Sequence, residues 1–446
     1  MSDQHAAFAS GCYGHTVVKT PNIDRLASEG VRCDNAYTTS PVCVPARFSA
    51  MCGQYPHTTG CLFSTPLPVD VRTAAHMFRD HGYLTAFIGK MHPCEPQTYG
   101  YDFLVDMGHY YDYLGPKTEV FARGMGAKDT GSGMPWMNSW YRPHSWHDEP
   151  LSPQMPSVLD DADHFEAFVA RNCESFLTRY GHRPFFLFAS LLKPHHPFFA
   201  PPEYHAMYPP EEMELPETAL DWANVPDDAR HKLATELADQ GEEALRKAQA
   251  TISAYYACTT YMDECVGRIL ATLDRLGLAE NTIVVYTSDH GEMLYDYGLR
   301  GKFVFYERSA RVPLIVRHPG QIAAGTSTDA LIDFTDLVPT SLGLAGLENT
   351  DRLDGVDQSQ VIRSEIPRLR DACFSELRDR IMIRTERWKL CRYPGEQWYL
   401  YDMVNDPAES TNLYEERRND PEIVACRERL LAWKAEPPRY EGANKR

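Results

Sequence analysis

The chain has 446 residues, of which 43% are hydrophobic and 24% charged, a composition typical of a globular protein with two or three domains. Its net charge of −18, from 44 basic and 62 acidic side chains, argues against nucleic acid or an anionic membrane as the main partner. No apolar run approaches the roughly 18 residues that cross a bilayer.

The cysteines and the first residues bear on the cellular compartment. Twelve cysteines without a C-x-x-C pair are too sparse for a disulfide scaffold and favour reduced thiols in an intracellular protein. The first ten residues, MSDQHAAFAS, show no signal peptide. We therefore expect a cytoplasmic protein, or a periplasmic or secreted one if a segment precedes Met1. The oligomeric state stays open.

Strand and helix patterns alternate along the first three quarters of the chain. Helical spacing of apolar residues predicts helices over 252–278 and 331–347. Nearly continuous apolar runs predict strands that are covered on both faces. These runs lie at 83–89, 184–192, 281–288 and 313–317. The alternation predicts an α/β domain with a largely parallel sheet, in which functional groups gather where strands end.

The pattern changes towards the C-terminus. Short runs such as RIMIRT, RWKLCRY and QWYLYD, separated by polar turns, predict a small antiparallel sheet. We therefore expect a catalytic domain over residues 1–355 and a small α+β subdomain over residues 356–446. The stretch at about 105–160 has little periodicity, which predicts a loop insertion in the first domain.

This insertion is rich in aromatic side chains. Aromatic rings near an active site stack on sugars, and they also pack long loops onto a domain, so both interpretations stay open. The aromatic residues concerned are Tyr110, Tyr111, Tyr113, Trp136, Trp140, Tyr141, His144 and Trp146.

Polar residues follow the predicted strands at the points where these end. Together with an acid and an amide at the start of the chain, they predict an oxygen-rich site for a hard divalent cation, with lysines and histidines for an anionic substrate. A single histidine after a buried strand is more often structural, so the prediction depends on their shared placement. The residues are Asp3, Gln4, Lys90, His92, Lys193, His195, His196, Asp289 and His290.

The segment SPVCVPARFSAMCG places a cysteine before a predicted helix. Pro45 suits the first turn of that helix and Gly53 its end, so Cys43 lies at or just before the N-terminus. Free backbone N–H groups there favour an anion. Cys43 is therefore either a buried structural thiol or the reactive group of an enzyme.

The segment CVPAR (43–47) resembles the C-x-P-x-R signature of the type I, formylglycine-dependent sulfatases of the alkaline phosphatase-like superfamily. GKMH (89–92), KPHHPF (193–198) and the segment at 287–316 resemble further elements of that family, and IRTERWKLCRY and LYDMVNDPAESTNL resemble its C-terminal subdomain. The resemblance covers essentially the whole chain. Gln4 and His290 make the pattern most similar to the choline-sulfatase and phosphonate-monoester-hydrolase branch.

The resemblance implies a large α/β/α domain with a mostly parallel, mixed sheet and a small antiparallel C-terminal subdomain. It implies a sulfuric ester hydrolase, a sulfatase of the arylsulfatase type, that acts on a small-molecule or oligosaccharide sulfate ester. A maturation enzyme would convert Cys43 to formylglycine, whose aldehyde hydrate attacks the sulfur and expels sulfate by collapsing back to the aldehyde.

The resemblance also implies roles for individual residues. The Cys43-derived oxygen would face a divalent cation, for which Ca²⁺ is expected and Mn²⁺ or Mg²⁺ are alternatives. Arg47 would hold the formylglycine hydrate, and Lys90 and Lys302 the sulfate oxygens. His92 would be the base for the collapse step, and His195, together with Lys302, would protonate the leaving alcohol. The implied metal ligands are Asp3, Gln4, Asp289, His290 and Cys43.

Two alternative functions and one structural difficulty remain. The same site could serve a phosphonate monoester or phosphodiester hydrolase, because these substrates are similar tetrahedral monoanions. A sulfatase-like binding protein without activity is the alternative from another class. Only Met1 and Ser2 precede Asp3, so without an upstream segment we expect a sheet that lacks one strand and an Asp3 that is weakly anchored.

Overall fold

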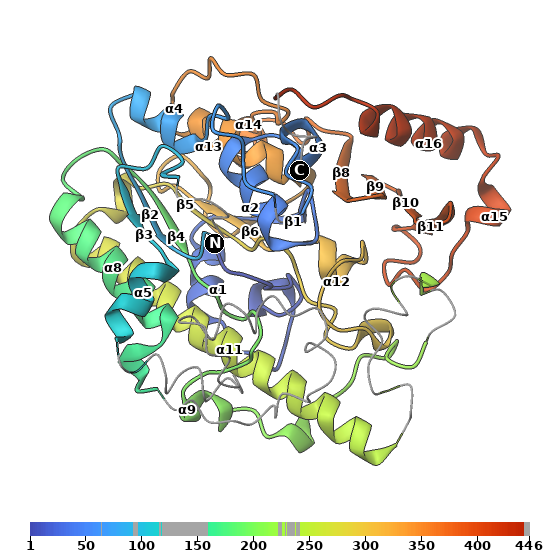
Figure 1. Ribbon diagram of the computed structural model, residues 1–446, viewed down its shortest axis with the longest axis horizontal. Helices are drawn as coiled ribbons and strands as arrows, with labels where there is room; N and C mark the ends of the chain where they lie inside the picture. The colour runs from blue at the N-terminus through green and yellow to red at the C-terminus, as the bar shows by residue number, and fades with distance from the viewer. Residues whose placement is uncertain are drawn as a thin grey trace, which may run out of the picture.

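The molecule consists of a large part around a central sheet and a smaller C-terminal part beside it (Figure 1). No described helix is long and apolar enough to cross a membrane. The computed structural model describes residues 1–63, 65–91, 97–115, 117, 159–221, 225–227, 229, 237 and 241–440.

Two hydrogen-bonded groups of strands form the central sheet. One group is parallel throughout, in the order β3 (Phe103–Val105), β2 (Leu84–Gly89) and β4 (Phe185–Ser190). The other has the order β5 (Val284–Thr287), β6 (Leu314–Arg317), β1 (Val31–Tyr37) and β7 (Thr326–Asp333). Strand β6 is antiparallel to both neighbours, whereas β1 and β7 are parallel. The sheet is therefore mixed, and the four strands predicted in this domain are confirmed.

The first residues of the chain lie between the two groups of strands. The Met1 ammonium donates to the carbonyl of Ala189 at 2.8 Å, and the Ser2 N–H donates to the carbonyl of Thr287 at 2.9 Å. Ser2 and Asp3 form parallel bridges to the segments that follow β5 and β4. Asp3 is fully buried, so the expectation of a weakly anchored Asp3 is wrong.

Helices cover both faces of the central sheet. Ala86 and Ile88 of β2 pack in the same core as α8 and α11, whereas Phe87 faces α2 and α4, as the alternation of side chains along a strand requires. The helices of this part are α1 (Pro21–Ser28), α2 (Cys43–Cys52), α3 (Pro56–Thr59), α4 (Ala74–Asp80), α5 (Met107–Leu114), α8 (Phe165–Tyr180), α9 (Pro202–His205), α11 (Glu242–Arg275), α12 (Glu307–Ala310), α13 (Leu337–Leu344) and α14 (Ser359–Ile362).

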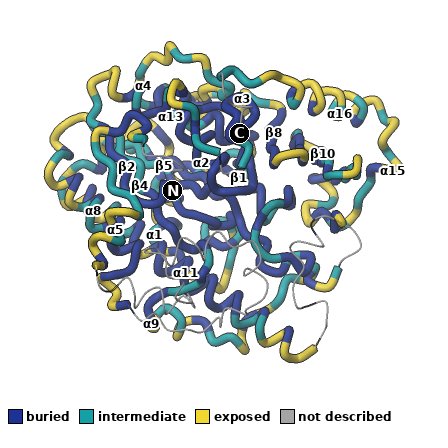
Figure 2. The backbone as a smooth tube through the Cα atoms, in the orientation of Figure 1, coloured by how far each residue is buried: buried dark blue, intermediate teal, exposed yellow. Residues whose placement is uncertain are grey.

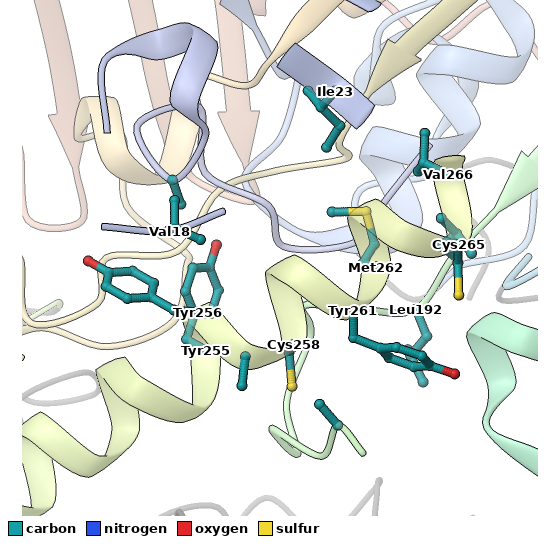
Figure 3. Close-up of a cluster of buried hydrophobic side chains, with 14 of the residues drawn as sticks. Val18, Ile23, Leu192, Tyr255, Tyr256, Cys258, Tyr261, Met262, Cys265 and Val266 are labelled. Atoms are coloured by element: carbon teal, nitrogen blue, oxygen red, sulfur yellow. The ribbon is translucent and has the colours of Figure 1, made fainter. Parts of the chain in front are cut away.

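The middle turns of helix α11 contribute many side chains to the hydrophobic core. Figure 3 shows Tyr255, Cys258 and Met262 among the buried side chains along this helix. The helix begins ten residues before the predicted 252–278. Its first buried positions are Ala244 and Ala248, and such small side chains give a weak hydrophobic signal, which explains the late predicted start.

The predicted helix over 331–347 is wrong in its first part. Residues up to Asp333 belong to β7, which pairs in parallel with β1, and α13 begins only at Leu337. A short apolar run fits a buried strand as well as a helix, and pairing with β1 decides for the strand.

The C-terminal part is an antiparallel sheet with a helix against it. Its order is β11 (Gln397–Asp402), β10 (Trp388–Tyr393), β9 (Arg380–Thr385) and β8 (Ala372–Leu377), which confirms the predicted small sheet and adds β8. Helix α16 (Pro421–Lys434) packs on it through a cluster that includes Trp433, and α15 (Tyr414–Arg417) precedes α16. The boundary at residue 356 stays a prediction.

A buried ion network joins the two parts. Lys389 of β10 is fully buried, and its Nζ lies 2.7 Å from both Glu307 Oε1 and Glu409 Oε1 and donates to the carbonyl of Phe305 at 2.8 Å. Burial opposes the charge on Glu307, but Lys389 and other cations outweigh it and lower the pKa to about 2. The C-terminal sheet thereby holds the segment that contains α12.

We expect Lys389→Met to destabilise the protein by about 3–5 kcal/mol, because it leaves two carboxylates buried without their shared cation. Urea denaturation followed by circular dichroism measures the change. The matched control is Arg246→Met, whose ion pair with Glu242 has side chains 67% and 90% exposed and should change stability by less than about 1 kcal/mol. Equal effects of both variants would contradict the role of the network.

Candidate active site

Cys43 is the first residue of helix α2. Pro45 lies in the first turn, and Gly53 ends the helix in the left-handed conformation with φ of 67°. Every residue of the helix is buried, and Figure 2 shows α2 inside the molecule. This confirms the predicted position of Cys43, where the free N–H groups of the first turn favour an anion.

Arg47, one turn further along α2, connects both carboxylates of the site. Its Nε donates to Asp289 Oδ2 at 2.9 Å and its Nη2 to Asp3 Oδ2 at 2.8 Å. Its Nη1 donates to the Lys90 carbonyl at 2.9 Å and to Ser190 Oγ at 2.6 Å. The guanidinium is therefore directed at Asp3 and Asp289, and its predicted contact with a formylglycine hydrate stays a prediction. Ser190, a neutral hydroxyl at the end of an apolar run, is a supporting residue that the sequence did not indicate.

Four buried side chains could hold a metal ion together. Asp3, Cys43, Asp289 and His290 each contribute one ligand atom, and these atoms lie within 4.8 Å of one another. They come from the first residues of the chain, the start of α2 and the end of β5. Two carboxylates, an imidazole and an atom at Cys43 fit a divalent cation.

The two carboxylates differ in their electrostatic surroundings. Burial raises the pKa of Asp289 to about 6, and the nearby Asp3 carboxylate adds to this rise. Burial also acts to raise the pKa of Asp3, but Lys90, His195 and Arg47 outweigh it and hold the pKa well below its ordinary value. A cation bound between the carboxylates would favour the charged form of both.

Gln4, the remaining predicted ligand, has an amide whose orientation is fixed. Its backbone N–H donates to Asp289 Oδ1 at 3.0 Å, and its Oε1 accepts from Lys302 Nζ at 2.8 Å. Its Nε2 donates to Glu292 Oε2. Because an ionised carboxylate only accepts hydrogen bonds, Glu292 requires the amide nitrogen of Gln4 to face it and leaves the amide oxygen directed at the site.

Glu292 also holds the loop that leads to Lys302. Its Oε1 accepts from the N–H groups of Leu294 at 3.1 Å and Gly301 at 2.5 Å. Its side chain is 2% exposed. The sequence analysis did not identify Glu292, although it lies within the segment that resembles the second metal segment of the sulfatases.

Cys43 Sγ lies among cationic and metal-binding groups. It is 3.1 Å from Lys302 Nζ, 3.2 Å from His290 Nε2 and 3.9 Å from both Lys90 Nζ and Asp3 Oδ1. Burial acts to raise the pKa of the thiol, but Lys302, Lys90 and His290 outweigh it and hold the pKa well below its usual value. This position therefore favours a negatively charged group.

The structure places only some of the predicted histidines and lysines near Cys43. His195 Nε2 lies 3.8 Å from Asp3 Oδ1, and burial together with Lys302 and Lys90 lowers the pKa of His195 to about 3. His196 stacks on His195 with ring centroids 4.0 Å apart. The side chain of Lys193 turns away from the site to the carbonyl of Pro197 at 2.5 Å. His92 lies outside the described residues.

The arrangement can bind a cation and a tetrahedral anion side by side. The carboxylates of Asp3 and Asp289 attract the cation, and the ammonium groups of Lys90 and Lys302 attract anionic oxygens beside Cys43. A group at Cys43 would then contact both.

Comparisons with known proteins agree with this geometry. A family model described as Sulfatase matches residues 1–347, and one described as N-sulphoglucosamine sulphohydrolase, C-terminal, matches residues 295–436. The chain is 30% identical to an arylsulfatase of Clostridium perfringens, with 97% of this chain and 92% of that protein covered.

Two further relatives and one solved structure extend this result. The chain is 30% identical to an ulvan-active sulfatase of Formosa agariphila (93% of this chain and 76% of that protein) and 32% identical to a choline-sulfatase of Rhizobium meliloti (89% and 78%). Its fold matches the phosphonate monoester hydrolase of Agrobacterium radiobacter with a TM-score of 0.76 at 23% identity, covering 97% of this chain and 94% of that one.

Replacement of Glu292 by glutamine tests its control over Gln4. Glutamine has one acceptor oxygen, so its amide nitrogen must face either the Gln4 amide or the N–H groups of Leu294 and Gly301. We expect the dissociation constant for Ca²⁺, measured by isothermal titration calorimetry, to rise about 10-fold or more.

The matched control is Glu280→Gln, which removes a charge from an exposed glutamate. We expect this variant to bind Ca²⁺ as the wild-type protein does. Unchanged Ca²⁺ affinity in a folded Glu292→Gln variant would show that Gln4 needs no support from Glu292.

Proposed function

The chain belongs to the sulfatase family and is a sulfuric ester hydrolase, and we propose that it removes sulfate from a sulfated carbohydrate. The sulfatase model covers most of the chain, and the arylsulfatase relative extends over nearly all of it. The observation that carries the proposal is the place of Cys43, whose Sγ lies among two lysines, His290 and the carboxylate of Asp3.

A divalent metal is general for this family, and we propose that Ca²⁺ occupies the site here. Asp3, Gln4, Asp289 and His290 would hold it, with an oxygen at Cys43 as a further ligand. The carboxylate and amide oxygens of this set suit a hard cation. When bound, the cation neutralises sulfate oxygens and favours the ionised form of the attacking hydroxyl.

Formylglycine is likewise general for the family, and we propose that a maturation enzyme makes it from Cys43. The aldehyde hydrate of this residue supplies the nucleophile for attack on sulfur. Arg47 pairs with Asp3 and Asp289 and holds both carboxylates in place beside it. The described contacts of Arg47 are with these carboxylates and with Lys90, Ser190 and the carbonyl of Ser2.

The lysines and His195 would act on the substrate itself. Lys90 and Lys302 would hold the sulfate oxygens, where negative charge is concentrated during the reaction. His195 would protonate the leaving alcohol. Its lowered pKa makes the imidazole neutral, and the negative charge of a bound sulfate ester would raise that pKa towards the range of a general acid.

Support for a carbohydrate substrate comes from the ulvan-active relative. Tyr110, one of the aromatic residues of the insertion, adds little, because it is buried and donates its hydroxyl hydrogen to the carbonyl of Asp163 at 2.7 Å, as a packing residue would. Trp136, Trp140, Tyr141, His144 and Trp146 lie outside the described residues.

The second candidate function is hydrolysis of phosphonate monoesters or phosphodiesters. The amide of Gln4 beside His290 favours it, because these ligands resemble those of the phosphonate-monoester-hydrolase branch. Measured kcat/KM for 4-nitrophenyl sulfate and 4-nitrophenyl phenylphosphonate separates the two. A higher value for the phosphonate would overturn the sulfatase as the main activity.

Co-production with a formylglycine-generating enzyme tests the maturation of Cys43. We expect the mass of the peptide that contains Cys43 to fall by the difference between cysteine and formylglycine, and sulfatase activity to rise with the modified fraction. Arg47→Lys is a second variant, and we expect it to lose activity because an ammonium lacks the separate, fixed nitrogens with which the guanidinium reaches Asp289, Asp3 and Ser190 at once. An unmodified thiol with full activity would exclude the proposed nucleophile.

Removal of the metal tests the proposed cation. We expect a chelator to abolish turnover of 4-nitrophenyl sulfate by the matured protein, and Ca²⁺ to restore it more fully than Mn²⁺ or Mg²⁺.

A screen of sulfated monosaccharides and oligosaccharides, choline sulfate and aryl sulfates then identifies the alcohol portion of the substrate. Preference for choline sulfate over every sulfated sugar would contradict the proposed substrate class.

A further inference from the structure

Phe303 connects the active site with the surface. It follows Lys302, whose Nζ lies 3.1 Å from Cys43 Sγ, and its N–H donates to the carbonyl of Pro41 at 3.2 Å. Its side chain is only partly buried, and its ring centroid lies 6.3 Å from that of Phe63, which is also partly buried. Two apolar rings therefore lie next to the segment that would bind sulfate.

An exposed arginine lies over one of these rings. The guanidinium carbon of Arg378, in the turn between β8 and β9, lies 4.2 Å from the centroid of the Phe63 ring. Within the part of the chain that the structure describes, Arg378 forms no ion pair with a carboxylate. Its side chain is exposed, and the ring of Phe63 holds the guanidinium at the surface, where an anion can reach it.

Docking of the C-terminal part does not need Arg378. Arg380, two residues later, is 7% exposed and donates to the carbonyl of Phe303, so it fixes this turn against the catalytic part. The exposed cation of Arg378 is additional to that contact.

Phe303 and Arg378 both have a left-handed backbone conformation. Phe303 has φ of 79° and Arg378 has φ of 59°. Arg378 is one of the two residues between β8 and β9, where a tight hairpin turn requires positive φ, so its conformation is that of the turn. Phe303 directly follows Lys302, and positive φ at a non-glycine residue outside such a turn is concentrated at functional sites.

We propose that Phe63, Phe303 and Arg378, here called the rim cluster, bind the sugar next to the sulfated one. The two rings would contact the apolar face of that sugar, and Arg378 would pair with an anionic substituent on it, a carboxylate or a second sulfate. The inference rests on the proposed function, since it assumes a sulfated carbohydrate. It restricts the substrate class to acidic oligosaccharides.

Three disaccharides test the rim cluster. Each carries one scissile sulfate, and the second sugar is a uronate, a sulfated sugar or a neutral hexose. We expect Arg378→Ala to raise KM for the two acidic disaccharides about tenfold relative to the neutral one, with kcat little changed, because one charge-assisted contact to bound substrate is lost. The acidic disaccharide whose KM rises more carries the anion that Arg378 recognises.

Two further variants keep the result interpretable. Phe63→Leu removes the ring under Arg378 and should, like Arg378→Ala, lower the preference for acidic disaccharides. Arg387→Ala is the matched control, since Arg387 also lies over an aromatic ring, that of Trp388, at 4.6 Å, and it should leave the preference unchanged.

The outcomes separate this inference from the proposed function. Equal KM changes for acidic and neutral disaccharides in Arg378→Ala would overturn the rim cluster while sulfatase activity on sugars stands. The wild-type protein could instead hydrolyse 4-nitrophenyl sulfate but no disaccharide, and show no calorimetric binding of the acidic disaccharides. That outcome would overturn both the carbohydrate substrate and the rim cluster.

Discussion

The site depends on the compensation of buried charge around Arg47. Asp3 and Asp289 are both fully buried, and transfer of an ionised group from water into a protein costs several kcal/mol unless it is paired. The guanidinium of Arg47 lies between them with a separate nitrogen for each. Because Asp3 and Asp289 lie far apart in the sequence, helix α2 must be in place before Arg47 can pair with both. The acids of the proposed metal site and the helix that carries Cys43 therefore depend on each other.

The first residues of the chain satisfy this requirement through backbone pairing. Ser2 lies beside Ser288, and Asp3 beside Pro194, as if a short strand stood between β4 and β5. Parallel strands that end at one edge of a sheet bring the residues after them together. The positive φ of Gln4, 63°, then turns the chain so that its N–H reaches Asp289. A pairing of only three residues thus supplies two of the proposed metal ligands.

Local patterns in the sequence were sufficient to predict an element wherever one segment determines its own structure. The apolar runs before Lys90, His195 and Asp289 predicted strands and their ends, and Pro45 and Gly53 predicted the helix that begins at Cys43. These features need no knowledge of partners elsewhere in the chain. Most of the proposed catalytic and metal-binding groups stand at such ends, which explains why sequence analysis could identify them.

Features that depend on distant partners were not predictable in this way. Glu292 is one of many acidic residues, and only its contacts with Gln4 and Gly301 distinguish it. Ser190 matters because Arg47 reaches it from 143 residues away. The apolar run that ends at Asp333 became a strand because β1 pairs with it. In each case a contact between residues far apart in the sequence decides the structure. Such a contact leaves no periodic signal in the sequence.

The C-terminal sheet has consequences for Lys302, although it contributes none of the residues around Cys43. Arg380 holds the carbonyl of Phe303, Lys389 holds the carbonyl of Phe305, and the Tyr393 hydroxyl accepts the N–H of Phe305. These contacts fix the backbone directly after Lys302. Because the ammonium of Lys302 must stay close to Cys43 in this buried site, a shift of this sheet would move a charge that the site needs. The same hairpin that holds Phe303 exposes Arg378, so the position of Lys302 and the proposed selection of substrate are linked through β8 and β9.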